Sequence, residues 1–299
     1  MNLFREKLYE HHSQLFTIDA EVYRGETRFQ DVLIFENRLF GRILALDGVI
    51  QLTERDNHIY HEMIAHVPLL AHGGAKRVLI IGGGDGGTLK EVLKHPVDSV
   101  VMVELDDDVV ALSKRYLPQV SGGAFDESRV DIIIGSGADY VASSEKTFDV
   151  IIVDSTDPIG PGEQLFTERF YDHCHRMVGP KGILALQSGT PFYNPQQLEN
   201  VCDRLGHSFN AVRPYLAPVP SYPGGMLAMV VAGESYKALR PPIKVLRDLF
   251  ERLQLSAEYY TPEIHRAAFT MPPFMRGLGC GAMNETARPK SDEKTFVSA

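Results

Sequence analysis

The sequence predicts an α/β fold in which a small N-terminal antiparallel β domain precedes a larger domain built on a doubly wound, mainly parallel sheet. Three observations support this. Apolar runs that suit buried strands alternate with helical patterns between residues 70 and 235, a glycine run follows the first such strand, and the opening 55 residues carry short β-prone runs separated by turn residues. We therefore divide the 299 residues into an N-terminal β domain (1–55), a larger α/β domain (56–278) and a polar tail (279–299) that we expect to be disordered.

The N-terminal domain is predicted from three β-prone runs, Phe29–Phe35, Arg38–Leu46 and Val49–Thr53. The Asp-Gly pair between the second and third runs suits the positive-φ positions of a tight hairpin turn. Apolar residues at helical spacing then predict a helix over 57–71, interrupted near Pro68 because proline removes a backbone hydrogen bond.

The larger domain is predicted from strand–helix alternation along the chain. The strands are predicted in "KRVLIIGGGDGG", where a glycine turn follows the strand, and in "SVVMVELD", "VDIIIGSG", "TFDVIIVDSTD", "GILALQSGT" and a late "GMLAMVVAG". The clearest helical patterns are "TLKEVLKH" and "DDVVALSKRYLP". Fully apolar strands joined through helices are typical of a parallel sheet covered on both faces.

A glycine run marks the predicted ligand site. In "IIGGGDGGTL" (80–89), Gly82 and Gly84 lie between a strand and a helix start, where absent Cβ atoms and free N–H groups let a ligand approach. Glu104 ends the next strand, the position from which a carboxylate binds both hydroxyls of an adenosine ribose. Together these features predict a Rossmann-like nucleoside site, although a structural glycine turn and a solvated acid are the plainer alternatives.

Asp85 inside that loop narrows the choice of nucleoside. A dinucleotide would place its pyrophosphate against this carboxylate, and unit charges near 4 Å interact by roughly 4 kcal/mol at an effective dielectric constant of 20. Asp85 therefore disfavours NAD and favours a ligand with positive charge near the loop, such as an adenosyl sulfonium with an amine tail.

Two further acids, Asp154 and Asp157, follow the fourth strand in "IIVDSTDPIGPGEQLF". We expect strands one and four to be neighbours, so that these acids converge with Asp85 on one crevice without a nearby lysine or arginine. A magnesium or calcium ion is one way to neutralise them, and an organic polyamine is the other. In the second case Asp154 would be the general base for the attacking amine and Asp157 would bind the far ammonium, or merely cap the turn before Pro158. The Gly-Pro-Gly segment that follows is consistent with a lid over the substrate and equally with a structural turn.

Composition and charge disfavour some other classes of function. A net charge of −9 disfavours nucleic acid, whose phosphates would be repelled. The charged N-terminus has no apolar core of a signal peptide, and no apolar run approaches the length of a membrane span, so we expect a cytoplasmic protein.

These motifs, in order from about residue 4 to about residue 275, resemble the polyamine aminopropyltransferases, most closely bacterial spermidine synthases. The quoted stretches are "LDGVIQLTERDNHIYHEM", "VLIIGGGDGG", "VELD", "DSTDPIGPGEQLF" and "PSYPGG". The resemblance implies transfer of an aminopropyl group from decarboxylated S-adenosylmethionine to putrescine, giving spermidine and methylthioadenosine. The donor is then a co-substrate, no cofactor or metal is implied, and the assembly is expected to be a homodimer or homotetramer.

The resemblance also assigns roles to individual residues. It implies that Asp154 is the catalytic base and that the amine is bound by His61, Asp85, Asp157, Tyr60 and Tyr222. The donor side is implied to consist of Gln30, Gln51, Gly82, Gly84, Asp85, Glu104, Ser136, Gly137 and Pro161. Without the resemblance, Tyr60 and His61 would be interpreted as core residues of a helix and the two glutamines as solvent-facing strand residues.

Ser136 departs from the family's pattern, which has an acid before the glycine to contact the adenine amino group. Loss of a charge-assisted contact costs about 1–3 kcal/mol, so we expect weaker donor affinity. Two alternative functions stay open: a small-molecule methyltransferase on the same fold, and a non-catalytic protein that binds polyamine or nucleoside. The acceptor also stays open among putrescine, cadaverine, agmatine and spermidine.

Overall fold

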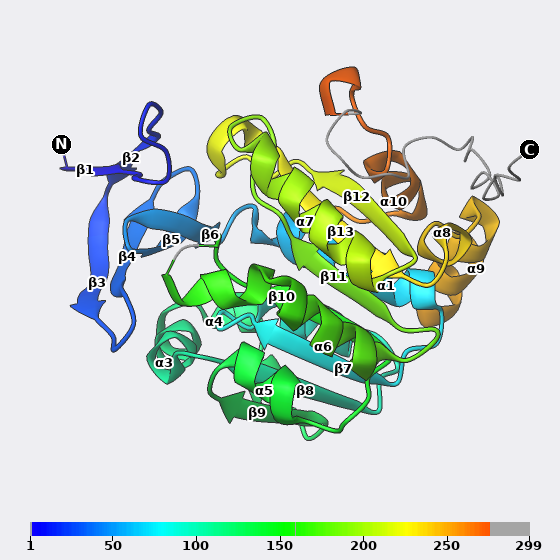
Figure 1. The fold of residues 1–299 in the computed structure, drawn as a ribbon. Coiled ribbons are helices and arrows are strands. Elements are labelled where there is room, and N and C mark those ends of the chain that lie inside the picture. The colour runs from blue at the N-terminus through cyan, green and yellow to red at the C-terminus, as the bar shows by residue number, and fades with distance from the viewer. Residues whose placement is uncertain (1, 159, 276–299) are drawn as a thin grey trace, which may run out of the picture.

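The computed structural model describes residues 2–158 and 160–275, and the tail predicted to be disordered (279–299) lies outside this part. The described residues form a two-stranded sheet, a four-stranded N-terminal sheet and a seven-stranded large sheet. Figure 1 shows the first two, in blue, beside the carboxyl ends of the large sheet. The predicted fold class, a mainly parallel α/β sheet after a small antiparallel β domain, is confirmed.

The N-terminal sheet is an antiparallel meander. Its last turn carries Asp47 and Gly48 at φ of +50° and +77°, as the Asp-Gly pair predicts. Three strands lie on the predicted runs, whereas β1, β2 and β3 have no counterpart in the predictions because much of their surface is exposed and they lack a clear apolar alternation. The elements are β1 (Asn2–Arg5), β2 (Leu15–Ile18), β3 (Ala20–Glu26), β4 (Asp31–Asn37), β5 (Gly41–Leu46) and β6 (Val49–Thr53).

The large sheet has the strand order β12-β13-β11-β10-β7-β8-β9. Its strands are β7 (Arg77–Gly82), β8 (Ser99–Glu104), β9 (Val130–Ile134), β10 (Val150–Asp154), β11 (Ile183–Gln187), β12 (Ala211–Ala217) and β13 (Leu227–Gly233). β7 through β11 pair in parallel, and β13 runs antiparallel to both of its neighbours. β12 was not predicted, and its Pro214 is tolerated because the strand lies at the sheet edge.

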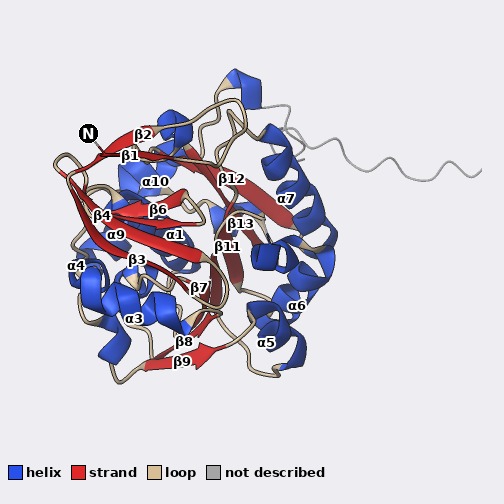
Figure 2. Cartoon of the chain, turned by 90° about the vertical axis from the view of Figure 1, so that its left-hand side faces the viewer, coloured by secondary structure: helices blue, strands red, loops and turns tan. Residues whose placement is uncertain are grey.

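Helices cover both faces of the large sheet, and Figure 2 shows α5, α6 and α7 on the side opposite α1 and α9. A hydrophobic core lies on each face of the sheet, and alternate residues of each strand point into one or the other. Ile80 and Ile152 face the α1 side, and Ile81 and Val153 face the α6 side. The helices are α1 (Asn57–His72), α2 (Gly87–Leu93), α3 (Asp107–Tyr116), α4 (Pro118–Ser121), α5 (Gly137–Ser143), α6 (Glu168–Val178), α7 (Pro195–Ser208), α8 (Tyr236–Leu239), α9 (Ile243–Leu253) and α10 (Pro262–Ala268). Short 3₁₀ turns are η1 (Ala124–Asp126), η2 (Gly160–Phe166), η3 (Pro223–Gly225) and η4 (Pro273–Met275).

The predicted interruption of the first helix at Pro68 is wrong, because α1 continues through Pro68 to His72. A proline inside a helix costs about 3 kcal/mol. Most of α1 is buried, including Met63, Ile64 and Leu70, so its packing against the sheet outweighs this local cost.

The N-terminal sheet is joined to the larger domain by an apolar core of its own. Leu44, Leu46 and Leu52 of the sheet pack against Val109 of α3 and Leu117 before α4. This contact fixes the N-terminal sheet over the carboxyl ends of β7 and β8, so that it forms one wall of the cleft described next.

Candidate active site

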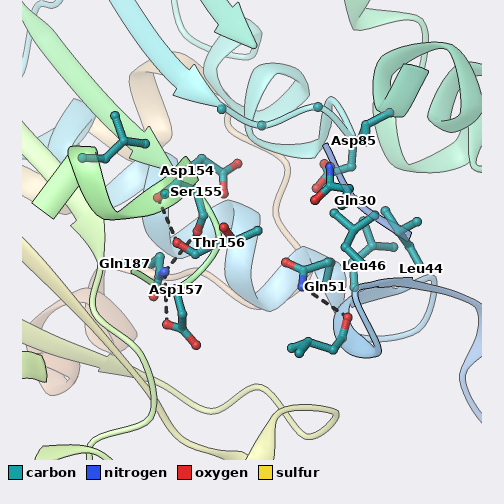
Figure 3. A pocket seen from close by; sticks show the side chains of 18 of the residues that line it. Gln30, Leu44, Leu46, Gln51, Asp85, Asp154, Ser155, Thr156, Asp157 and Gln187 are labelled. Atoms are coloured by element: carbon teal, nitrogen blue, oxygen red, sulfur yellow. Dashed lines mark hydrogen bonds between the residues drawn. The ribbon is translucent and has the colours of Figure 1, made fainter. Parts of the chain in front are cut away.

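A cavity of about 660 Å³ lies where the N-terminal sheet faces the carboxyl ends of β7, β8 and β10. β7 and β10 are parallel neighbours, and the partner of Asp154 in the register is Gly82. Glycine is required there, because its φ is +83° and a Cβ would lie 2.0 Å from the backbone oxygen of Asp154. The glycine loop and the acids after β10 therefore border one crevice, as predicted from the strand order. Figure 3 shows Asp154 and Asp157 on one side of it and Asp85, Gln30 and Gln51 on the other.

Asp154 presents one bonded and one unbonded carboxylate oxygen. Its Oδ1 accepts a hydrogen bond of 2.6 Å from the hydroxyl of Tyr60 on α1. Its Oδ2 is buried and accepts no hydrogen bond of standard geometry from the described residues, although the hydroxyl of Thr88 lies near enough to lower the pKa of this carboxyl. Burial, and then the negative charge of Asp85, raise the pKa of Asp154 above its ordinary value. A buried carboxylate with a raised pKa and a free oxygen is suited to accept a proton.

Asp85 has a histidine partner, although the sequence places no lysine or arginine near the three acids. His61 Nε2 lies 3.3 Å from Asp85 Oδ1, which also accepts the N–H of Gly87 at 2.6 Å. Burial opposes the charges, but the mutual attraction raises the pKa of His61 and lowers that of Asp85. The sequence did not reveal this pair because the partners lie on different elements. Consequently, Asp85 alone is a weaker argument against a pyrophosphate than the sequence suggested.

Asn57 favours the protonated form of His61. The Asn57 side-chain NH₂ donates to the backbone oxygens of Thr53 and Glu54, both at 2.9 Å, so its Oδ1 faces His61 Nδ1 at 3.2 Å. His61 thus has an acceptor beside each ring nitrogen, an arrangement that favours the doubly protonated ring and agrees in direction with its raised pKa.

Asp157 is held by neutral donors. Its Oδ1 accepts from Gln197 Nε2 at 3.0 Å and, more distantly, from Gln187 Nε2 at 3.5 Å. None of the ion pairs formed among residues 2–158 and 160–275 involves Asp157. Its carboxylate interacts with side chains from β11 and α7, which the alternative role of a simple turn cap before Pro158 does not explain.

Glu104 lies at the opposite end of the cavity, beside the glycine loop. Its Oε1 accepts the N–H of Asp106 at 3.0 Å, and a Cβ at Gly84 would meet its Oε2 at 3.1 Å. Burial raises the pKa of Glu104 to about 7 despite that hydrogen bond. Gln30 reaches the same end, where its Nε2 donates to Asp106 Oδ2 at 3.0 Å. These polar groups gather at one wall, as the predicted ribose site requires.

Other predicted donor residues line the same cavity. Ser136 is the N-cap of α5, and its hydroxyl accepts the N–H of Asp139 at 3.2 Å. A Cβ at Gly137 would lie 2.3 Å from Ile81, so this glycine allows close helix–strand packing. Gln51 faces the cavity from β6, and its backbone oxygen accepts the hydroxyl of Tyr222 at 2.5 Å.

The predicted lid is a 3₁₀ turn, η2, which contains Pro161. Gly162, Gln164 and Leu165 of this turn line the cavity. The segment therefore borders the site from the side of Asp154, and its closure over substrate remains a prediction.

Several lining residues were not predicted: Asp106, Asp139 and Gln187, with Gln197 behind Asp157. Gln187 lies within the predicted strand "GILALQSGT", which the structure ends at Gln187, so the sequence prediction did not mark it as a strand-end residue. In the described part of the chain, the group of acids close enough to share a metal ion is Asp106, Asp107 and Asp108, rather than the three acids of the cleft. None of the described helices has the length and apolar content needed to span a bilayer.

A glycine loop after the first parallel strand, an acid after the second and paired acids after the fourth define a Rossmann-like nucleoside-binding protein with an acidic second subsite. Comparison with known proteins specifies the family. Residues 57–240 match the "Spermine/spermidine synthase domain" and residues 3–54 the "Spermidine synthase tetramerisation domain". The chain belongs to the spermine and spermidine synthase family, and it is a polyamine aminopropyltransferase, an enzyme of polyamine biosynthesis.

Relatives and solved structures agree over nearly the whole chain. The polyamine aminopropyltransferase of Ruegeria sp. (strain TM1040) is 48% identical over 91% of this chain and 96% of its own length. Polyamine aminopropyltransferase 1 of Pseudomonas aeruginosa is 48% identical over 92% of this chain and 96% of its own length. A spermidine synthase crystallised with the transition-state analogue AdoDATO has a TM-score of 0.87 at 37% identity, covering 93% of this chain and 94% of its own. The spermidine synthase of Thermotoga maritima has a TM-score of 0.84 at 36% identity over the same shares.

Proposed function

We propose that the enzyme transfers the aminopropyl group of decarboxylated S-adenosylmethionine to putrescine, giving spermidine and methylthioadenosine, with Asp154 as general base. The observation that carries this proposal is the free, buried Oδ2 of Asp154 between the Glu104 end and the Asp157 end of one cavity. A nucleoside at the first end and an amine at the second would meet beside that oxygen.

The proposed step balances without a further reactant. The neutral acceptor nitrogen attacks the propyl carbon bonded to the sulfonium, a C–N bond forms and the C–S bond breaks. The electron pair of that bond goes to sulfur, which leaves as a neutral thioether. Asp154 has by then taken one proton from the bound acceptor ammonium, so the product nitrogen keeps its two protons as a secondary ammonium. Neither an acid nor a cofactor is needed, because the sulfonium is already an activated leaving group.

Asp154 would remove the proton that keeps the acceptor amine from acting as a nucleophile. An aliphatic amine has a pKa of about 10.4, so only about one molecule in 2,500 is nucleophilic at pH 7. A carboxylate beside the nitrogen can take the proton once the amine is bound and desolvated. The hydroxyl of Tyr60 on Oδ1 holds the carboxylate so that Oδ2 is the accepting atom.

The charges around the cleft favour a donor that ends in a bare amine, as decarboxylated S-adenosylmethionine does, over one that ends in an amino acid group. His61 lies beside Asp85, whereas Asp154 and Asp157 have no ion-pair partner among the described residues. Both would repel the carboxylate of intact S-adenosylmethionine and attract ammonium groups. This argument disfavours the methyltransferase alternative.

We also propose that the enzyme is a homotetramer assembled through its N-terminal domain. The match of residues 3–54 to a tetramerisation domain supports this. Light scattering of the wild-type protein would test it, and a monomer at micromolar concentration would contradict it.

The reaction is tested by incubating the enzyme with decarboxylated S-adenosylmethionine and putrescine. Spermidine and methylthioadenosine in equal amounts are the expected products. Methyl transfer from intact S-adenosylmethionine, with no product from the decarboxylated donor, would establish the methyltransferase alternative. Binding of either ligand without turnover would establish the non-catalytic one.

A further inference from the structure

We propose that Gln197, together with Gln187, makes the acceptor site selective for a primary ammonium end over a guanidinium end. This inference rests on the proposed function, in which Asp157 binds the far end of the acceptor. It extends that function, because putrescine and agmatine share the same four-carbon chain and amine and differ at the end that Asp157 would meet.

The orientations of both glutamine amides are fixed from the backbone. The N–H of Gly189 donates to Gln187 Oε1 at 2.7 Å, which turns the Gln187 NH₂ toward Ser155 O and Asp157 Oδ1. The N–H of Gln197 donates to Asn194 Oδ1 at 3.3 Å, so the Asn194 NH₂ faces Gln197 Oε1 at 3.1 Å. The Gln197 NH₂ must then face Asp157.

These two amides occupy one oxygen of Asp157. A carboxylate oxygen has about two lone-pair sites, and Oδ1 of Asp157 accepts from both glutamines. Oδ2 has no hydrogen-bond partner in the part of the chain that the structure describes. Figure 3 shows Asp157 with its bond to Gln187, at the edge of the pocket opposite Gln51. The carboxylate thus offers a ligand one oxygen instead of two.

The chemistry of the two cations turns this restriction into selectivity. A guanidinium is a planar fork that binds a carboxylate best through two parallel N–H···O bonds, one to each oxygen. An ammonium is a compact point charge that one oxygen can satisfy. Because the amides are neutral, Asp157 keeps its full charge and attracts both ions, so only the geometry distinguishes them.

Gln197 also has a purely structural interpretation as part of the cap of α7. It is buried, 7% exposed, and its backbone N–H is bonded to the N-cap residue Asn194. A structural role would reduce activity with every acceptor equally. A role in selectivity would change the ratio between acceptors, and this difference makes the two roles separable.

The test measures kcat/KM for putrescine and for agmatine, with decarboxylated S-adenosylmethionine as donor. The wild type is expected to prefer putrescine by at least about 100-fold. Gln197→Met, which keeps the side-chain length and removes the donor, is expected to reduce that preference about tenfold, equivalent to about 1.4 kcal/mol, mainly through KM. Gln196→Met is the matched control, since Gln196 is the exposed neighbour on α7 and bonds to Asn200; its ratio should equal that of the wild type.

The results of these assays distinguish failure of the selectivity inference from failure of the proposed function. An unchanged ratio in Gln197→Met, with thermal unfolding and methylthioadenosine affinity like those of the wild type, would overturn the inference. Use of agmatine by the wild type within tenfold of putrescine would overturn it too, whether or not any variant folds. No product from putrescine would refute the proposed function itself, whereas product from putrescine and agmatine alike would refute this inference alone.

Discussion

Replacing Asp154 by asparagine tests the proposed base directly. In Asp154→Asn the hydroxyl of Tyr60 can still donate to the amide oxygen, as it does to Oδ1 at 2.6 Å. The NH₂ group then takes the place of Oδ2 and presents a donor to the amine, so the proton has no acceptor. General-base catalysis contributes about 10²–10⁴-fold, and we expect kcat to fall about 10³-fold, or about 4 kcal/mol of transition-state stabilisation.

The assay follows methylthioadenosine release at saturating substrates from pH 7 to pH 9. In the variant, kcat should rise about tenfold for each pH unit, because the fraction of neutral amine rises toward its pKa of about 10.4. Calorimetry should give a methylthioadenosine affinity like that of the wild type. Asp131→Asn, at an exposed acid of β9, is the control and should leave kcat unchanged. A kcat for Asp154→Asn within tenfold of the wild type would refute the assignment.

Three further predictions concern the rest of the cavity. Burial raises the pKa of Glu104 to about 7, and ribose hydroxyls donate to its ionised form, so methylthioadenosine affinity should fall as pH drops from 8 to 6; calorimetry on Glu104→Gln should give weak binding with no such slope. Ser136→Asp should tighten methylthioadenosine binding about tenfold by restoring a charge-assisted contact, and unchanged affinity would argue against that role. Gly87→Ala would place a Cβ 2.1 Å from the His61 ring, so its KM for putrescine should rise at least tenfold, whereas Gly74→Ala, with no atom within 4 Å, should behave as wild type.

The fold was predictable because its main signals are local in the sequence. Each central strand is an apolar run such as "VLIIG" or "VIIVD", and each is bounded by glycine, aspartate or a helical pattern. β3 and β12 were missed because their sequences lack that signature: β3 is largely exposed, and β12 contains Pro214 at the sheet edge. Pro68 misled the prediction because the packing that stabilises α1 comes from distant strands.

The candidate site was predictable where its residues follow strand ends. Asp154 and Glu104 each end a strand, and adjacency of parallel strands then brings them to one cavity. The partners that set their chemistry were not predictable in the same way. His61 reaches Asp85 from α1, and Gln197 reaches Asp157 from α7. Such contacts depend on tertiary packing, which no local pattern in the sequence records.

The hydroxyl of Tyr222, bonded to the backbone of Gln51, joins the larger domain to the N-terminal sheet at the cavity itself. Leu44, Leu46 and Gln51 of that sheet are walls of the same cavity. The enzyme therefore cannot be trimmed to a minimal catalytic fragment beginning at α1, because truncation would open the nucleoside pocket to solvent.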